Sequence, residues 1–281
     1  MKKTLLLSFA AATVAFAGCS SMNMTSATSA GMKALQAMTI SDAEIEGYVS
    51  EYIQQLDAEN TIATGNDAYN VRLNRIAGKI NGVDGINIKV YKTQDVNAFA
   101  VADGNVRIYS GLMDIMSDEE VLGVIGHEIG HIKLKHTKEA FKNALLTSAL
   151  RDGISSVGGR VGALSQSQLG DLGEALASSQ FSQKQEFEAD NYGYDFLKAH
   201  GLNPIAMALS FQKLQQMEAQ AGSNASGPIL QLFSTHPNLN ARISNMVERA
   251  TKDGYLNNGS ATTGGTSTTK QQSTGTGKWA Y

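Results

Sequence analysis

The chain has 281 residues and a mass of 29.9 kDa, and 42% of it is hydrophobic, enough to bury a substantial core. It carries 23 basic and 26 acidic residues, a net charge of −3, without a run rich in lysine and arginine, so we expect no nucleic-acid partner. Its single cysteine, Cys19, excludes an intrachain disulfide framework.

The first eighteen residues predict a bacterial lipoprotein signal peptide. Lys2 and Lys3 form a short basic segment, and residues 5–17 form an apolar segment that is short for a membrane span. Two small residues then precede Cys19, an order that resembles the lipobox, with Phe16 in the place where leucine is usual. In lipoproteins this cysteine is acylated and becomes the first residue of the mature chain. A plain secretory signal with an incidental cysteine is the alternative.

Lipidation at Cys19 would fix the mature protein to a membrane. Each buried CH₂ group of an acyl chain contributes ~0.8 kcal/mol, so several chains together give lasting attachment. Ser20 follows the cysteine, and the lack of an aspartate there favours export to the outer membrane. We therefore expect an outer-membrane protein that faces the periplasm and is held by its N-terminal lipid anchor.

Composition divides the chain into four parts. After the signal peptide of residues 1–18, residues 19–37 are small and polar without an apolar period, which predicts a flexible tether. Residues 38–254 form the predicted folded domain, in which no repeat of 20–50 residues is visible. Residues 255–281 are rich in Gly, Ser and Thr and would bury too little apolar surface to offset the entropy of ordering, which predicts a disordered tail.

The patterns within the domain predict a helix-dominated α+β fold with one small sheet. Ser41 with Glu44, and later Ser117 with Glu120, have the spacing of a capping box at a helix start. Asp103-Gly104 between two apolar runs predicts a β-hairpin. Periodicity predicts strands at 86–90, 97–102 and 105–109, and helices that start after Ser41 and Ser117 and at 71–80, 169–179, 181–199, 204–221 and 239–250.

The chemistry is concentrated in His127-Glu128-Ile129-Gly130-His131, inside the helix predicted to begin after Ser117. Histidines four residues apart lie one turn apart on the same helix face, so both imidazoles can reach one Zn²⁺ ion at ~2.0–2.1 Å. Glu128 lies beside them and is placed to act as a general base. A polar helix surface with incidental histidines is the alternative, but a capped helix directly after a hairpin is the context that this motif requires.

A catalytic zinc site needs a third protein ligand as well as an open position. His136 is five residues past the second motif histidine and would lie on another face of a continuous helix. Glu186 and Asp190 share one face of a later helix, while Glu188 points about 160–200° away from both. Glu186 is therefore the expected ligand, and Asp190 would accept a hydrogen bond from the far N–H of a ligand histidine. A solvated acidic helix face is the alternative.

Together these motifs resemble the HtpX and CAAX-prenyl-protease type of gluzincin metallopeptidase. The HExxH sequence is followed by a distant Glu186-Phe187-Glu188-Ala189-Asp190, and then by Thr235-His236-Pro237 with Arg242 five residues past the proline. Asn97-Ala98-Phe99-Ala100 and Tyr109-Ser110-Gly111-Leu112, on either side of the predicted hairpin, also match that family. The likeness covers nearly all of the predicted domain, and the lipobox places the chain with the periplasmic lipoprotein branch.

The resemblance implies a zincin-like metallopeptidase fold, with the small sheet beside the active-site helix and one Zn²⁺ ion per chain. It implies three metal ligands, a general base and a residue that orients a ligand. These are His127, His131 and Glu186, then Glu128, and then Asp190. His236 is implied to face the metal.

Two residues keep alternative roles. His236 precedes a proline, which favours an extended backbone in a fixed loop. Its imidazole either stabilises the oxyanion of the tetrahedral intermediate or becomes a fourth ligand that displaces the water and closes the site, the role we favour. Arg242 either holds this loop near the site or stabilises developing charge, and a plain surface arginine is the alternative.

These expectations describe a zinc-dependent endopeptidase that clears misfolded or unassembled envelope proteins. An extended substrate would add as a strand beside Asn97, Ala98, Phe99 and Ala100, where backbone hydrogen bonds give affinity with little sequence choice. Its partners would be unfolded envelope polypeptides, and outer-membrane assembly machinery or a partner protease are further candidates. A chaperone or assembly factor with a latent zinc site is the alternative function. A structural zinc site is weaker, because such sites favour four Cys or His ligands.

Overall fold

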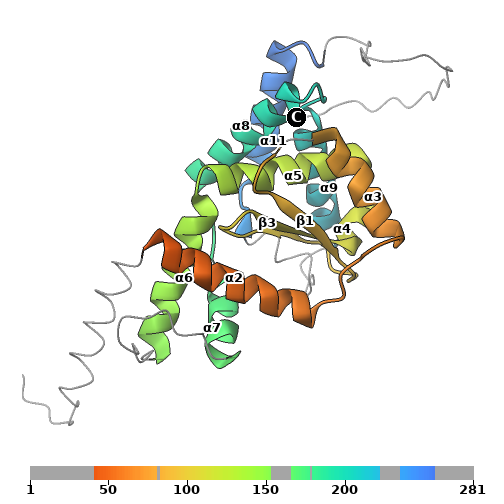
Figure 1. Cartoon of the computed structure of the whole chain (residues 1–281). Helices are drawn as coiled ribbons and strands as arrows, with labels where there is room; N and C mark the ends of the chain where they lie inside the picture. Colours follow the sequence, from red (N-terminus) through yellow and green to blue (C-terminus); the bar gives the residue numbers. More distant parts are fainter. Residues whose placement is uncertain (1–40, 81–82, 153–165, 178, 222–234, 257–281) are drawn as a thin grey trace, which may run out of the picture.

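The computed structural model describes residues 41–80, 83–152, 166–177, 179–221 and 235–256, and Figure 1 shows their arrangement. The predicted signal peptide, Cys19, the tether and all but the first two residues of the predicted tail lie outside the described residues. Among the helices within those ranges, none has the length and apolar character that a membrane crossing requires.

Helices dominate the described part of the chain and surround one three-stranded sheet, as the sequence patterns predict. The strands are β1 (Asn87–Tyr91), β2 (Ala98–Ala100) and β3 (Asn105–Tyr109). The helices are α2 (Asp42–Glu59), α3 (Ala68–Ala77) with the 3₁₀ turn η1 (Gly78–Ile80), α4 (Ser110–Ile115), α5 (Asp118–Lys133), α6 (His136–Asp152), α7 (Gln166–Ala177), α8 (Gln183–Ala199), α9 (Ala206–Ala221) and α11 (Leu239–Lys252).

The sheet has the strand order β1-β3-β2, so the shortest strand lies at one edge. β2 and β3 pair antiparallel as the predicted hairpin, with Phe99 opposite Arg107. β1 pairs with β3 in parallel, with Val90 opposite Ile108, a pairing that local patterns do not predict. The central strand β3 is thus hydrogen-bonded to a neighbour along both edges. Among the described strands, β2 has a partner along one edge only, so its other edge could accept a further strand.

Two apolar clusters hold these elements together. In the larger one, residues of the sheet such as Ile108 pack with Ile125 of α5, Leu197 of α8 and Met246 of α11. In the second, α2, α6 and α7 pack around Phe141 and against the β2 end of the sheet. Figure 1 shows α2, α6 and α7 grouped on one side of the molecule, away from α8 and α11. The sheet and α5 therefore lie between two helical layers.

The backbones of α5 and α8 approach each other closely because glycines lie at their crossing. A Cβ atom added at Gly130 would lie 2.6 Å from the carbonyl oxygen of Ala189, and one added at Gly193 would lie 2.8 Å from the carbonyl carbon of Gly126. Neither side chain fits at those distances, so any other residue would push the helices apart. This contact brings the start of α8 against the HExxH motif.

Candidate metal centre

The two motif histidines of α5 converge on one point. A capping box that starts at Ser117 fixes the beginning of this helix, as the sequence predicts. His127, Glu128 and His131 lie in its second half, and each is at most 3% exposed. The Nε2 atoms of the two histidines are 3.0 Å apart. One helix turn therefore supplies two nitrogen donors directed at the same place.

Helix α8 supplies a carboxylate to the same place. Ser182 caps α8 with Gln185 as its partner, and Glu186 follows in the first turn with no exposed surface. Its Oε1 atom is 3.4 Å from Nε2 of His131, and its Oε2 atom is 3.6 Å from Nε2 of His127. The close packing of α5 against α8 thus joins a residue distant in sequence to the motif.

The loop before α11 supplies a fourth donor. Nδ1 of His236 lies 3.1 Å from Nε2 of His127 and 3.0 Å from Oε1 of Glu186. Asn238, two residues later, has a left-handed backbone with φ of 67°, a conformation that asparagine tolerates better than most residues. The donor atoms of the histidines at 127, 131 and 236 and of Glu186 all lie within 4.8 Å of one another.

These four side chains fit a tetrahedral metal ion. Ligand atoms ~2.0–2.1 Å from a zinc ion are about 3.3–3.4 Å from one another, and the five donor-atom distances given above, which involve both oxygens of Glu186, are 3.0 to 3.6 Å. Burial, followed by the charge of His127, lowers the pKa of His131 well below its usual value, so this imidazole is neutral, as a ligand must be. Oε2 of Glu186 is buried and makes no directed hydrogen bond among the described residues, but it forms a close ion pair with Arg242 and lies near His127.

Asp190 lies one turn after Glu186 on α8 and contacts the far nitrogen of a motif histidine. Its Oδ1 atom is 2.8 Å from Nδ1 of His127. Burial raises the pKa of Asp190, but the charge and hydrogen bonds of Arg242 outweigh it and hold this pKa below the usual range. Asp190 is therefore a carboxylate, and it accepts the Nδ1 proton of His127 so that Nε2 faces the cluster of donors.

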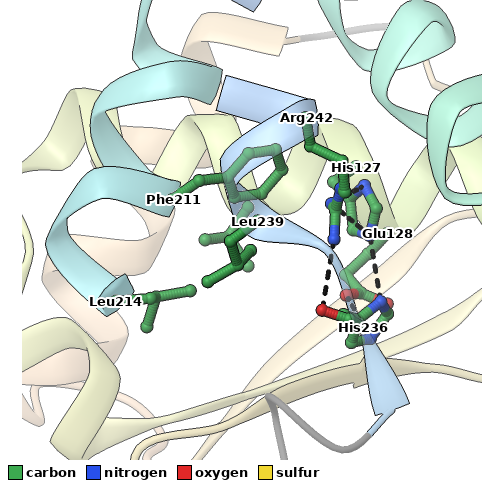
Figure 2. Close-up of a pocket in the computed structure, with 8 residues that line it drawn as sticks. His127, Glu128, Phe211, Leu214, His236, Leu239 and Arg242 are labelled. Atoms are coloured by element: carbon green, nitrogen blue, oxygen red, sulfur yellow. Dashed lines mark hydrogen bonds and ion pairs between the residues drawn. The ribbon is translucent and has the colours of Figure 1, made fainter. Parts of the chain in front are cut away.

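Arg242 is buried, which excludes the surface alternative. Its Nε and Nη2 atoms donate to the two oxygens of Asp190 at 2.7 and 2.8 Å, and its guanidinium lies 4.2 Å above the ring centre of Phe211. Nη2 is also 3.3 Å from Nδ1 of His127, and Nη1 donates to the carbonyl oxygen of His236 at 3.4 Å. Figure 2 shows this side chain reaching from α11 toward both histidines. Arg242 thus links α11 and its loop to the cluster.

Glu128 lies beside the four donors without being one of them. Its Oε1 atom is 3.9 Å from Nε2 of His236. Burial raises the pKa of Glu128, and the charges of His236 and His127 offset only part of that effect. A carboxyl group whose pKa is raised toward neutral pH can both accept and return a proton. Figure 2 shows it below His127, on the His236 side.

His136 does not lie where a continuous helix would place it. α5 ends at Lys133, and Lys135 has a left-handed backbone with φ of 64°, so α6 starts in a new direction. Nδ1 of His136 lies 3.2 Å from Nδ1 of His131, and its Nε2 atom lies 3.5 Å from the carboxylate of Glu188. His136 therefore contacts the ring nitrogen of His131 that does not face the donor cluster. The sequence analysis did not place it in the site. The local sequence has neither glycine nor proline to signal the change of direction.

The four residues predicted to bind a substrate strand lie close to the cluster. Asn97, Ala98, Phe99 and Ala100 include the whole of edge strand β2. Together with Glu128 and His236 they line one cavity of about 330 Å³. The structure thus brings together all the predicted site residues of the described chain, whereas Cys19 lies outside it.

Comparison with known proteins gives the family of the chain. The model of the family described as "Peptidase family M48" matches residues 73–250. The chain is 44% identical over 255 residues to "Metalloprotease LoiP" of Escherichia coli (strain K12), covering 90% of this chain and 98% of that protein. It is 36% identical over 256 residues to "Metalloprotease YcaL" of the same organism, covering 89% of this chain and 98% of that protein.

A more distant relative shares only part of its length with this chain. The "Beta-barrel assembly-enhancing protease" of Escherichia coli (strain K12) is 30% identical over 164 residues, which are 56% of this chain and 32% of that protein. The family match includes the HExxH helix, Glu186 and Arg242. Within the buried group of three histidines and one glutamate, His127, His131 and Glu186 form a set of three donors of the kind that holds a catalytic metal. The chain belongs to peptidase family M48 and is a metalloendopeptidase, as its motifs predict.

Proposed function

We propose that this chain is a zinc-dependent endopeptidase of the bacterial cell envelope, which hydrolyses misfolded or unassembled envelope proteins. The observation that carries the catalytic part is the position of Glu128, a buried carboxyl group beside converging donors to which it does not itself belong. His127, His131 and Glu186 would hold the metal. Zinc at this place would supply an activated water and polarise the peptide carbonyl of the substrate.

The residues around the metal ligands would divide the remaining work. Glu128 would accept the proton of the attacking water and return it to the leaving amine. Asp190, fixed by Arg242, would keep His127 in the tautomer that directs Nε2 to the metal. β2 would bind an extended segment of the substrate through its free edge. The side chains that would carry these roles, and the outer edge of β2, all belong to the described residues.

His236 would act as a removable fourth ligand. Its Nδ1 atom lies 3.1 Å from Nε2 of His127 and 3.0 Å from Oε1 of Glu186, so it would complete a four-ligand set. A closed set has no position for water, and hydrolysis then requires the loop of His236 to withdraw. A metal site closed by His236 in this way would be an inactive resting state, which restrains a protease of broad specificity.

The envelope location rests on the N-terminal sequence and on the relatives. Cys19 follows two small residues and an apolar segment of lipobox type. One relative is named for enhancing β-barrel assembly, and β-barrels are proteins of outer membranes. We expect the Cys19→Ala protein to leave the outer-membrane fraction, measured by fractionation and immunoblotting. Retention of that variant in the membrane would contradict the lipid anchor.

The decisive experiment combines metal analysis with degradation of an unfolded test protein such as casein. The purified wild type should contain about one zinc ion per chain and should lose activity with a chelator. Glu128→Gln keeps the size of the side chain and all four donors, so it should retain zinc while hydrolysis falls by about 10²-fold or more. Near-normal hydrolysis by this variant would contradict the role of Glu128.

An assembly factor with a latent protease site is the second candidate. The observation that favours it is the complete set of four donors, which leaves the site closed unless His236 moves. In that case Glu128→Gln would support outer-membrane protein assembly as well as the wild type does. Loss of that support together with loss of hydrolysis would favour the protease.

A further inference from the structure

The two motif histidines differ in what holds the ring nitrogen that faces away from the donor cluster. Nδ1 of His127 lies 2.8 Å from a carboxylate oxygen of Asp190. Nδ1 of His131 lies instead 3.2 Å from Nδ1 of His136, a second imidazole. A carboxylate can only accept a hydrogen bond, whereas a neutral imidazole accepts at one nitrogen and donates at the other. The role of His136 therefore follows from the partners of both its nitrogens.

The direction of the hydrogen bonds through His136 is fixed at both ends. Nε2 of His131 lies among the metal donors, and a nitrogen that binds zinc carries no proton, so the proton of this ring is on Nδ1. Nδ1 of His136 must then accept that proton, which leaves the proton of His136 on Nε2. This Nε2 atom lies 3.5 Å from Oε2 of Glu188, a group that can only accept. All the donors thus point the same way, from His131 through His136 to Glu188.

The last step of this chain is its weakest. The side chain of Glu188 is 43% exposed, so water can replace its carboxylate as the acceptor for Nε2 of His136. His136 is only 5% exposed, and His131 has no exposed surface, so water has little access to the contact between the two rings. The imidazole of His136 is therefore the link that cannot readily be replaced.

The surroundings hold the two rings in place. His136 is the first residue of α6, and the amide of Gln185 on α8 donates to Glu139 in the same turn of α6 at 3.1 Å. The ring of Phe181 stacks on His131, with ring centres 3.9 Å apart. The first turn of α6 is thus joined to the helix that carries Glu186, and His131 is covered on one face.

Burial alone does not explain the contacts of His136. Thr137, the next residue on α6, is 6% exposed, yet its Oγ1 atom lacks a hydrogen-bond partner among the described residues. A polar group on this turn can therefore be buried without a partner. Both nitrogens of His136, by contrast, face a group whose hydrogen-bonding role matches their own.

We propose that His136 is a positioning residue of the metal centre, which accepts the Nδ1 proton of His131 and so fixes the tautomer and the ring orientation of that ligand. His131 would be oriented through an imidazole, as His127 is oriented directly by Asp190. The proposal rests on the zinc binding of the proposed function and adds a residue to it. Partners that orient a metal ligand in this way typically change metal affinity by about 10–100-fold.

The first test measures zinc affinity by competition with a chelator. His136→Leu removes the acceptor but fills much of the same space, so it should lower zinc affinity by about 10–100-fold. His136→Asn keeps an oxygen near the position of Nδ1 and should recover most of that loss. Thr137→Val is the matched control, because it alters a buried polar group on the same turn and should leave zinc affinity unchanged. Equal affinity in His136→Leu and the wild type, or no recovery with asparagine, would overturn the proposal.

The second test detects the hydrogen bond itself and does not depend on whether a variant folds. In the zinc-loaded wild type with isotope-labelled histidine, NMR should show a scalar coupling between the Nδ1 nuclei of His131 and His136 through the shared proton. It should also place the proton of His136 on Nε2. A His136 ring protonated on Nδ1, or the lack of a coupling, would overturn the proposal. If the wild type binds no zinc, the proposed function fails, and the coupling measured in that protein decides the role of His136.

Discussion

Arg242 binds both carboxylate oxygens of Asp190, although the two residues are 52 positions apart. Both side chains are fully buried, and Asp190 in turn contacts His127. The pair therefore connects α11 to α8 and, through one histidine, to α5. A charge pair in this environment is stable only while both partners are present, because a lone buried charge is strongly unfavourable.

Arg242→Met should lower the free energy of unfolding by about 3–5 kcal/mol, since it leaves the buried carboxylates of Asp190 and Glu186 without their positively charged partner. It should also weaken zinc binding, because Asp190 would no longer be fixed against His127. Urea unfolding and competition with a zinc chelator measure the two effects. Arg249→Met is the matched control on the same helix: Arg249 pairs with the exposed Asp195, and its loss should cost about 1 kcal/mol without changing zinc affinity. Equal losses in both variants would contradict a special role for Arg242.

Three acidic residues of α8 should respond differently to alanine. Glu186→Ala should abolish tight zinc binding, because it removes a donor from the cluster. Asp190→Ala should lower zinc affinity or activity by about 10–100-fold through the misplaced His127. Glu188→Ala is the control and should have little effect, since this side chain is 43% exposed and, among the described residues, its ion pairs are with His136 and Lys184. Zinc titration that ranks Glu188 above Glu186 would contradict the assigned ligands.

His236→Ala should increase the hydrolysis of unfolded protein and weaken zinc binding, because it opens a position in the four-ligand set. Casein degradation and zinc content, measured on the same preparation, check both effects. A decrease in hydrolysis with zinc retained would instead favour stabilisation of the oxyanion. His200→Ala, at the end of α8, removes a histidine whose ring contacts Phe196 one turn earlier, far in the helix from Glu186, and it should change neither quantity. If His236→Ala also changes neither, His236 has no role in the site.

The ion pair between α2 and the sheet should make stability depend on pH. Burial raises the pKa of Asp57, but hydrogen bonds from Arg107, Lys89 and Tyr91 outweigh it and lower the pKa to about 2 from a usual value of 3.8. A lowered carboxyl pKa stabilises the fold above the unfolded value of 3.8, and this stabilisation is lost as pH falls toward 2. Asp57→Asn should therefore lose about 1–2 kcal/mol at pH 7, after allowance for partial exposure, and less below pH 4.

Urea unfolding of the wild type and of Asp57→Asn at pH 7, 5, 4 and 3 measures this dependence. The difference between the two proteins should stay constant from pH 7 to 5 and shrink as Asp57 takes up its proton. Asp67→Asn is the control, because its partner Lys92 lies in an exposed pair that contributes little. A difference that grows on acidification would contradict the role of the Asp57 carboxylate.

Local sequence determined the parts of this site that lie within one element. Positions four residues apart on a helix share a face by geometry alone, so His127 and His131 could be assigned as a pair before any fold was known. The capping boxes at Ser41 and Ser117 and the turn at Asp103-Gly104 act between near neighbours, and the structure confirms all three. The order of motifs also identified the family, and the family match and the identities to its members confirm that identification.

Tertiary structure decided which distant groups meet and what surrounds them. Glu186 reaches the motif because backbone contact at Gly130 and Gly193 lets α8 approach α5, and this contact has no local signal. The sequence did not decide whether Arg242 is buried. An arginine is buried only where the fold places a carboxylate such as that of Asp190 beside it, and local patterns do not predict such a contact. His136 lies against His131 because Lys135, which is not a glycine, adopts a left-handed backbone, and no local residue signals this conformation. Periodicity describes one element at a time, whereas the packing of elements far apart in sequence depends on all of their surfaces together.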